Sequence, residues 1–390
     1  MSEPLALHGG RPVRVAFLPY GRQAVDEDDV QAVLAALRSD WLTTGPQVAA
    51  FERAVAGVVG AAHAVAVSSG TAALHAAMFA AGIGPGDEVI VPALTFAASA
   101  NAVLYQGGIP VFADVRADTL TVDPADVRAK LTPRTRAVMA VDFAGQPADL
   151  DELVAIARGA LLPLIEDAAH ALGAEYRGRR VGALADLTTF SLHPIKHVTS
   201  GEGGLAVTDS AERAARLRRF RNHGIEPARG EEYSPMLDLG YNYRLTDLQS
   251  ALGLSQLAKL EPFLKRRAEI AQRYRTELAA QPGLALPAVL PHVRHGWHIF
   301  PVLLDPARLG TDRRTIVAAL RAENIGVTVH YVPVYWHPYY QARGYARGSC
   351  PRAEWAFERL LTLPLFPAMT ERDVDDVLAA VGKVLGHYLR

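Results

Sequence analysis

Short apolar runs alternate with amphipathic stretches through the first half of the chain. Apolar runs of this length, bounded by glycine, proline and polar residues, predict buried strands. We place these strands at 63–67, 88–91, 109–115, 136–142, 162–166, 187–192 and 204–208. Helical patterns lie between them, at 72–82, 95–105, 124–131 and 150–158. Strands that alternate with helices favour a mostly parallel sheet with helices on both faces.

The second half of the chain has a different pattern. A long helical pattern runs over 244–277 with one break near Pro262, and a closing helix is predicted at 374–389. Between them we expect strands at 298–304 and 327–331, separated by a helix at 314–324. We therefore predict a large α/β domain at 1–250 and a smaller α+β domain at 251–390. The first residues of the chain are expected to pack on the smaller domain.

Composition narrows the class of protein. Of the 390 residues, 50% are hydrophobic and 21% are charged, which excludes disorder as the main state. The formal net charge of −1 gives no overall basic field for nucleic acid, and the single cysteine, Cys350, excludes an internal disulfide. The uncharged stretch 89–113 is interrupted by proline, glycine and amide residues, so we interpret it as strand, helix and strand rather than a membrane span. We expect a cytoplasmic protein with no membrane, nucleic-acid or metal partner.

Ligands of open α/β sheets bind at the carboxyl ends of the strands. The first strand is followed by Ser68-Ser69-Gly70-Thr71. Small residues at a helix start leave backbone N–H groups accessible, and the helix dipole favours an anion there, so this run is a candidate phosphate site. An ordinary N-cap is the alternative interpretation, since serine and threonine serve that role as well.

Two further candidate groups follow later strands. Asp167 comes at the end of the fifth strand, with His170 one helical turn beyond it. This carboxylate either caps the strand or pairs with a protonated pyridine nitrogen. Lys196 lies in a loop between two strands, fixed by Pro194 and nearby glycines. It is either a solvated surface lysine or an amine that forms a Schiff base with a carbonyl, and Ser191 adds a hydroxyl for a phosphate.

The order of these groups is more informative than any one of them. A phosphate cup, an acid for a pyridinium and a Schiff-base lysine are the parts that a pyridoxal phosphate site requires. Competing motifs fit poorly, because the glycines at 82–86 precede a strand instead of following one, and the chain contains neither G-x-x-x-x-G-K-[ST] nor H-E-x-x-H.

At this point the chain resembles the fold-type I pyridoxal phosphate enzymes, and within them the DegT/DnrJ/EryC1/StrS sugar-nucleotide aminotransferases. The likeness covers nearly the whole chain. Its main runs are 17–23, 39–46, 68–74, 95–101, 166–170, the Lys196 loop, 240–247, 329–333 and 363–367. The resemblance implies a large domain with a mostly parallel sheet between helices and a smaller C-terminal α+β domain. It also implies a homodimer whose sites are shared between subunits.

The resemblance assigns roles residue by residue. Lys196 would hold the cofactor as a Schiff base and move a proton, Asp167 would pair with the pyridine nitrogen, and His170 would lie near the phenolic oxygen. Phe96 would stack on the ring. The phosphate would be held by Gly70, Thr71, Ser191 and the partner subunit's Asn242. The sugar nucleotide would be contacted by Arg22, Trp41, Thr43, Arg244, His330 and Tyr331, with Arg221 a weaker candidate. His193 would either assist catalysis near the sugar or brace its loop.

Within the family, the chain most resembles the transaminases that make UDP-4-amino-4,6-dideoxy-N-acetyl-β-L-altrosamine, on the runs 143–147, 194–197 and 240–244. Two positions depart from that pattern: Asp142 stands where histidine is expected, and Leu192 stands where phenylalanine is usual. The resemblance implies that L-glutamate donates an amine to a 4-keto-6-deoxy sugar nucleotide.

Several alternatives stay open. The acceptor sugar could be linked to UDP, dTDP or GDP and aminated at C3 or C4. A sugar dehydratase of the same fold would have histidine in place of Lys196, and a binding or regulatory protein of this fold would form no Schiff base. A nicotinamide dehydrogenase would need a glycine loop that the chain lacks.

Overall fold

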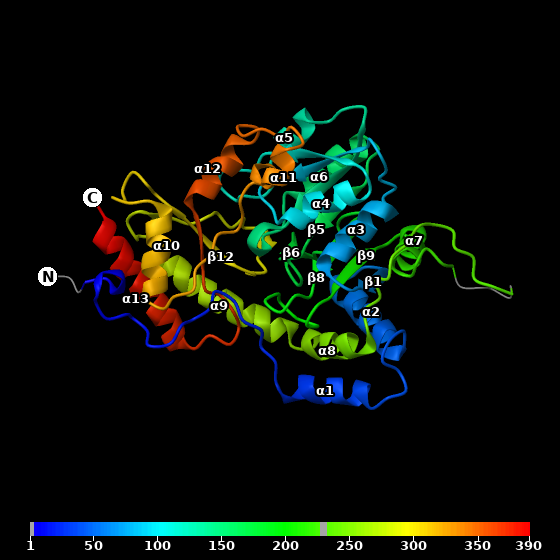
Figure 1. Cartoon of the computed structure of the whole chain (residues 1–390), viewed down its shortest axis with the longest axis horizontal. Helices are drawn as coiled ribbons and strands as arrows, with labels where there is room; N and C mark the ends of the chain where they lie inside the picture. The colour runs from blue at the N-terminus through cyan, green and yellow to red at the C-terminus, as the bar shows by residue number, and fades with distance from the viewer. Residues whose placement is uncertain (1–3, 227–231) are drawn as a thin grey trace.

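A computed structural model describes residues 4–226 and 232–390 (Figure 1). Its centre is a seven-stranded sheet with the strand order β1-β9-β8-β5-β4-β2-β3. Neighbouring strands from β8 to β3 are parallel, and β9 is antiparallel to both of its neighbours. The strands are β1 (His63–Val67), β2 (Glu88–Pro92), β3 (Ile109–Ala113), β4 (Thr135–Val141), β5 (Leu164–Asp167), β8 (Leu187–Ser191) and β9 (Gly204–Thr208). The predicted α/β fold class is confirmed.

Helices cover both faces of this sheet (Figure 1). One apolar core joins the sheet to α3 (Gly70–Ala80), α4 (Ala97–Tyr105) and α7 (Ala211–Arg221). Cores on the other face join it to α2 (Pro46–Val59), α5 (Pro124–Ala129), α6 (Leu150–Gly159) and α8 (Asp247–Leu257). Because helices bury both faces of the sheet, most residues of its strands are apolar.

A separate apolar core lies beside both chain ends (Figure 1). It combines Leu5 and Leu18 with residues from Ile270 onward. Its elements include α9 (Leu260–Leu278), β12 (Phe300–Leu304), α10 (Arg313–Ala322), β13 (Leu360–Leu363) and α13 (Glu371–Tyr388). Since Leu264 of α9 packs in a core of the large sheet and Ile270 packs here, we propose that the domain boundary lies within α9 and not at residue 251.

The remaining elements are short or peripheral. They are α1 (Glu27–Leu37), α11 (Pro338–Gln341), α12 (Pro351–Arg359), β6 (Glu175–Tyr176), β7 (Arg179–Arg180), β10 (Leu284–Ala285), β11 (Val293–Arg294), and the 3-10 turns η1 (Ala6–His8), η2 (Phe143–Gly145) and η3 (Val334–Trp336). One small sheet has the strand order β10-β12-β13, and another has the order β11-β6-β7. Over the described residues, the helices include none that is long and apolar enough to cross a membrane.

Two predicted features are wrong. The long helical pattern breaks at Ala258–Lys259, between α8 and α9, and not near Pro262. Pro262 lies in the first turn of α9, where an N–H has no intrahelical partner and proline costs little. The predicted strand at 327–331 is absent: Thr328 makes a single bridge to Thr362, and the chain then leaves the edge of β13. This departure lets His330 and Tyr331 line the cavity described next.

Candidate active site

A cavity of about 440 Å³ opens at the carboxyl ends of the parallel strands. Each strand that reaches it is followed by residues of the cavity wall. The described lining includes Ser69, Gly70 and Thr71 after β1, Phe96 after β2, Asp167 and His170 from β5 and its following loop, and Ser191, His193 and Lys196 from β8 and its following loop. This edge is where the topology of open α/β sheets places ligands.

One end of the cavity is the N-terminus of α3. Ser69 is the N-cap, and its hydroxyl accepts a hydrogen bond from the backbone N–H of Ala72. The N–H groups of Gly70 and Thr71 therefore remain without an intrahelical partner. Ser191 packs against Gly70 so closely that a Cβ there would lie 2.9 Å from Ser191 Cβ. Backbone donors, the helix dipole and the Ser191 hydroxyl would together suit an anion at this end.

Asp167 is a buried carboxylate on the same wall. Its Oδ2 accepts a 2.7 Å hydrogen bond from Ser99, and its Oδ1 accepts one from the backbone N–H of Ala169. Burial raises the pKa of Asp167, while the bond from Ser99 and the nearby Lys196 lower it. The carboxylate makes no ion pair among the described residues. A cationic ring nitrogen in the cavity would supply the partner that a buried charge needs.

Lys196 is enclosed in the cavity wall. The pKa of Lys196 is lowered to about 8, because burial lowers it, the nearby Asp167 raises it and Arg267 lowers it. A lysine with this pKa has a substantial neutral fraction near pH 7–8, and the neutral amine is the nucleophile for a carbonyl. Lys196 Nζ lies 3.4 Å from His298 Nε2. The amine is thus held by a neighbour and is not a solvated surface group.

A group of aromatic and imidazole side chains also lines the cavity. The Tyr331 hydroxyl lies 3.1 Å from His170 Nε2, and the His170 ring packs on His298 with centroids 4.3 Å apart. Burial lowers the pKa of His170 well below its ordinary value and that of His330 to about 4, so both rings are neutral. The Phe96 ring is 58% exposed although it lines a cavity, which leaves its face free for a planar ligand.

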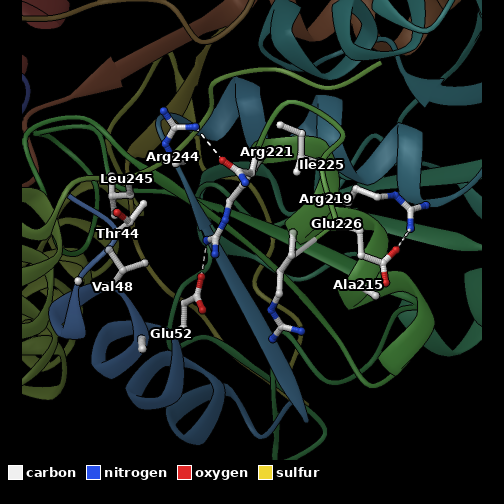
Figure 2. Close-up of a pocket in the computed structure, with 14 residues that line it drawn as sticks. Thr44, Val48, Glu52, Ala215, Arg219, Arg221, Ile225, Glu226, Arg244 and Leu245 are labelled. Atoms are coloured by element: carbon white, nitrogen blue, oxygen red, sulfur yellow. Dashed lines mark hydrogen bonds and ion pairs between the residues drawn. The ribbon is translucent and has the colours of Figure 1, made fainter. Parts of the chain in front are cut away.

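Five predicted site residues lie outside this cavity in the single chain: Arg22, Trp41, Thr43, Asn242 and Arg244. Arg244 lines a second cavity of about 550 Å³ between α2 and the end of α7 (Figure 2). There it donates a 2.8 Å hydrogen bond to Asn222, and the neighbouring Arg221 pairs with Glu52 (Figure 2). The other four are exposed to solvent. Their roles remain predictions.

Sequence reasoning missed several residues of the site. Ser99, in the first turn of α4, donates a hydrogen bond to Asp167 and also lies 2.7 Å from the Thr95 hydroxyl, which precedes that helix. Tyr20, His298 and Glu202 also line the cavity. Tyr20 and His298 come from segments far from Lys196 in sequence, and no local pattern predicts such a contact.

Comparisons with known proteins agree with this geometry. The model of the DegT/DnrJ/EryC1/StrS aminotransferase family matches residues 23–382. The spore coat polysaccharide biosynthesis protein SpsC of Bacillus subtilis (strain 168) is 44% identical over 378 residues, which cover 95% of this chain and 97% of that protein. Helicobacter pylori PseC, an aminotransferase involved in the biosynthesis of pseudoaminic acid, has a TM-score of 0.90 at 30% identity, covering 96% of this chain and 100% of that one. The PLP-form of Spr1654 from Streptococcus pneumoniae has a TM-score of 0.91 at 28% identity, again over 96% of this chain and 100% of that one.

The fold, the buried lysine and the buried acid define a pyridoxal phosphate-dependent aminotransferase. The chain belongs to the DegT/DnrJ/EryC1/StrS aminotransferase family, whose members act on sugars. The residues present fit the cofactor: the α3 N-terminus and Ser191 suit its phosphate, Asp167 suits its ring nitrogen, and Lys196 suits its aldehyde. The buried Nδ1 of His170, which has no hydrogen-bond partner among the described residues, leaves one more polar atom to be satisfied.

Proposed function

We propose that this enzyme transfers an amino group from L-glutamate to C4 of a UDP-linked 4-keto-6-deoxy N-acetyl sugar. The product would be UDP-4-amino-4,6-dideoxy-N-acetyl-β-L-altrosamine. The observation that carries the proposal is the arrangement of Lys196, Asp167 and the α3 N-terminus around one cavity. The choice of sugar rests on the sequence resemblance and on the likeness to PseC.

The chain's own residues would divide the work. Pyridoxal phosphate, when bound, supplies the electron sink that stabilises negative charge at the carbon losing its proton. Lys196 would hold the cofactor through its amine, and the same amine is the base that would take up the proton leaving the amino donor's α-carbon and deliver it elsewhere in the reaction. Asp167 keeps the ring nitrogen protonated.

The departure at Asp142 does not argue against this substrate. Val141 pairs with Asp167 across β4 and β5, and both residues line the cavity. Side chains alternate along a strand, so Asp142 lies on the other face of the sheet, away from the sugar. Leu192 is likewise buried in the core beneath α2 and is not part of the cavity wall.

We also propose that the active unit is a homodimer. The segment before Asn242 exposes large apolar side chains that a solvated monomer would leave uncovered, namely Tyr233, Met236, Leu237, Leu239 and Tyr241. Asn242 is itself exposed, which suits a residue that reaches the partner's cavity. Mixing Lys196→Ala and Asn242→Ala chains tests this: mixed dimers regain one native site if the site is shared, and no activity returns if each chain is self-sufficient.

The function is tested by product analysis. The cofactor-loaded protein is incubated with L-glutamate and UDP-, dTDP- or GDP-linked 4-keto-6-deoxy sugars, and products are identified by mass spectrometry and NMR. We expect amination of the UDP-linked N-acetyl sugar at C4, with 2-oxoglutarate released. Amination only of a dTDP- or GDP-linked sugar, or at C3, would replace the proposed acceptor. Loss of water without amination would indicate dehydratase chemistry.

A further inference from the structure

Arg267 is a fully buried arginine on α9, with 1% of its surface exposed. Its Nη1 donates to the backbone carbonyls of Trp297, His298 and Leu365 at 3.2, 3.0 and 3.1 Å. Its Nη2 donates to the carbonyls of Ile195 and Lys196, both at 3.4 Å. In the described part of the chain, no carboxylate lies within ion-pair distance of it. All its described acceptors are neutral.

Such a residue is costly to bury. A buried charge without a counter-ion is tolerated only when hydrogen bonds replace the water it has lost. Burial lowers the pKa of Arg267 to about 10, so the guanidinium still carries its charge at neutral pH. An apolar side chain of similar size would fill the space at a lower cost. The packing of the side chain therefore does not explain why a charged, planar guanidinium with several N–H donors is buried here.

The acceptors point to that reason, because two of the three segments that supply them carry side chains of the cavity wall. One segment carries Lys196 and the other carries His298. The two side chains approach within 3.4 Å between Lys196 Nζ and His298 Nε2. A single guanidinium thus bridges the backbones that bring these two nitrogen atoms together.

We propose that Arg267 is a positioning residue of the aminotransferase: it joins the Lys196 loop to the His298 segment, and its fixed positive charge favours the neutral amine at Lys196. The inference rests on the proposed role of Lys196 but assigns a separate function to α9. It requires that Arg267 act through its hydrogen bonds and charge, without touching the substrate.

The charge balance around Lys196 supports this role. Arg267 and Asp167 act on it in opposite directions, the first lowering and the second raising the lysine pKa. The imidazoles nearby are neutral, because burial lowers the pKa of each. These are His170, His197, His298 and His330. His193, Glu202, Tyr20 and Tyr331 complete the titratable groups of the cavity wall. Arg267 is therefore the fixed cation that favours a neutral amine here.

The experiment measures the reactivity of Lys196 directly. The cofactor-free full chain is treated with acetic anhydride between pH 6 and 11, and labelling of Lys196 is followed by peptide mass spectrometry. Wild type is compared with Arg267→Gln and Arg267→Lys. The matched control is Arg266→Gln, which removes the neighbouring arginine on the same helix, whose partners are Glu371 and the Met369 carbonyl. Far-UV circular dichroism and thermal melting check that each variant is folded.

We expect Arg267→Gln to raise the pH midpoint of Lys196 labelling by up to about one unit, because the opposing cation is gone. Arg267→Lys should leave the pH midpoint of Lys196 labelling unchanged, because it keeps the positive charge. It should slow pyridoxal phosphate binding several-fold, because it loses the guanidinium donors that hold the Lys196 loop. Arg266→Gln should change neither quantity. An unchanged midpoint in folded Arg267→Gln, or wild-type binding kinetics in Arg267→Lys, would overturn the proposal.

The two proposals fail differently. If wild type never binds pyridoxal phosphate but its Lys196 midpoint still depends on Arg267, the proposed function fails and the electrostatic role of Arg267 stands. If Arg267→Gln does not fold, Arg267→Lys decides the question through its binding rate and its midpoint. In that case a wild-type binding rate would overturn the positioning role.

Discussion

Two cavities lined by described residues differ in how their charged side chains are paired. The cavity between α2 and α7 is the larger, about 550 Å³, and its charged side chains are mostly paired with each other, as Arg221 is with Glu52 (Figure 2). The cavity at the sheet edge is about 440 Å³ and is lined by a buried acid, Asp167, and a partly buried amine, Lys196, neither of which has an ion-pair partner among the described residues. The cavity proposed as the active site is thus the smaller of the two.

The difference shows what marks a reactive site. Charges that are paired with each other near solvent contribute only a small free energy to the stability of their surroundings. Asp167 and Lys196 instead have shifted pKa values, and burial is the main cause of each shift. Both side chains line the cavity, where a ligand could reach them. Groups kept in this state are candidates for chemistry. Four predictions test the contrast, in order of expected effect.

Removing the amine should have the largest effect. Lys196→Ala should lower aminotransferase activity by at least about 10³-fold, since the variant has no group to hold the cofactor covalently or to move the proton. Steady-state assays with L-glutamate and the keto sugar measure this. Activity within tenfold of wild type would place the reactive amine elsewhere.

Neutralising the acid should act mainly on cofactor binding. Asp167→Asn keeps the shape and one hydrogen-bond acceptor for Ser99 but loses the charge that pairs with the ring nitrogen. Removing one partner of a buried charge pair costs about 2–5 kcal/mol, so affinity for pyridoxal phosphate should fall by well over tenfold. Isothermal titration of the cofactor-free protein measures it. Unchanged affinity would mean that Asp167 faces no cation.

A third prediction concerns the acids on the reverse face of the sheet, behind Asp167. Asp142 Oδ2 and Glu166 Oε1 are buried without a described hydrogen-bond partner, and burial raises the pKa of Glu166 to about 7 from an ordinary 4.5. The folded protein then keeps a proton that the unfolded chain releases. The free energy of unfolding should therefore fall as the pH rises from about 4.5 to 7.

Glu166→Gln should flatten that slope, because glutamine has no proton to lose. Urea unfolding at several pH values measures the slope for wild type and variant, with Asp142→Asn as the companion change. Identical slopes in all three proteins would show that the two acids do not share a retained proton.

The smallest effect on function is expected in the second cavity. Glu52→Gln weakens the pair with Arg221 and should lower the free energy of unfolding by about 1–2 kcal/mol. Cofactor affinity and the KM for the sugar nucleotide should stay as in wild type. A raised KM with normal stability would bring the second cavity, and with it Arg221 and Arg244, into substrate binding.

The sequence predicted the central sheet and the groups at its edge well, because each lies within one strand and the loop that follows. Periodicity located the seven strands of the central sheet but not the two-residue strands β6 and β7, and Gly70, Asp167 and Lys196 each lie at the end of a central strand or in the segment that follows it. The contacts of Arg267 and His298 could not be predicted, since they join residues far apart in the chain. The strand expected at 327–331 failed for a related reason: its residues have a strand-like composition, but they turn away to line the cavity.

The most direct test of the central claim is the visible absorption spectrum of the protein reconstituted with pyridoxal phosphate, recorded before and after addition of L-glutamate. We predict an absorption band of the Lys196-bound cofactor that L-glutamate converts to the spectrum of pyridoxamine phosphate, and the absence of that band in Lys196→Ala. A band that L-glutamate leaves unchanged would contradict the proposed amino donor. Failure of the wild-type protein to bind the cofactor at all would contradict the assignment of this cavity as the active site.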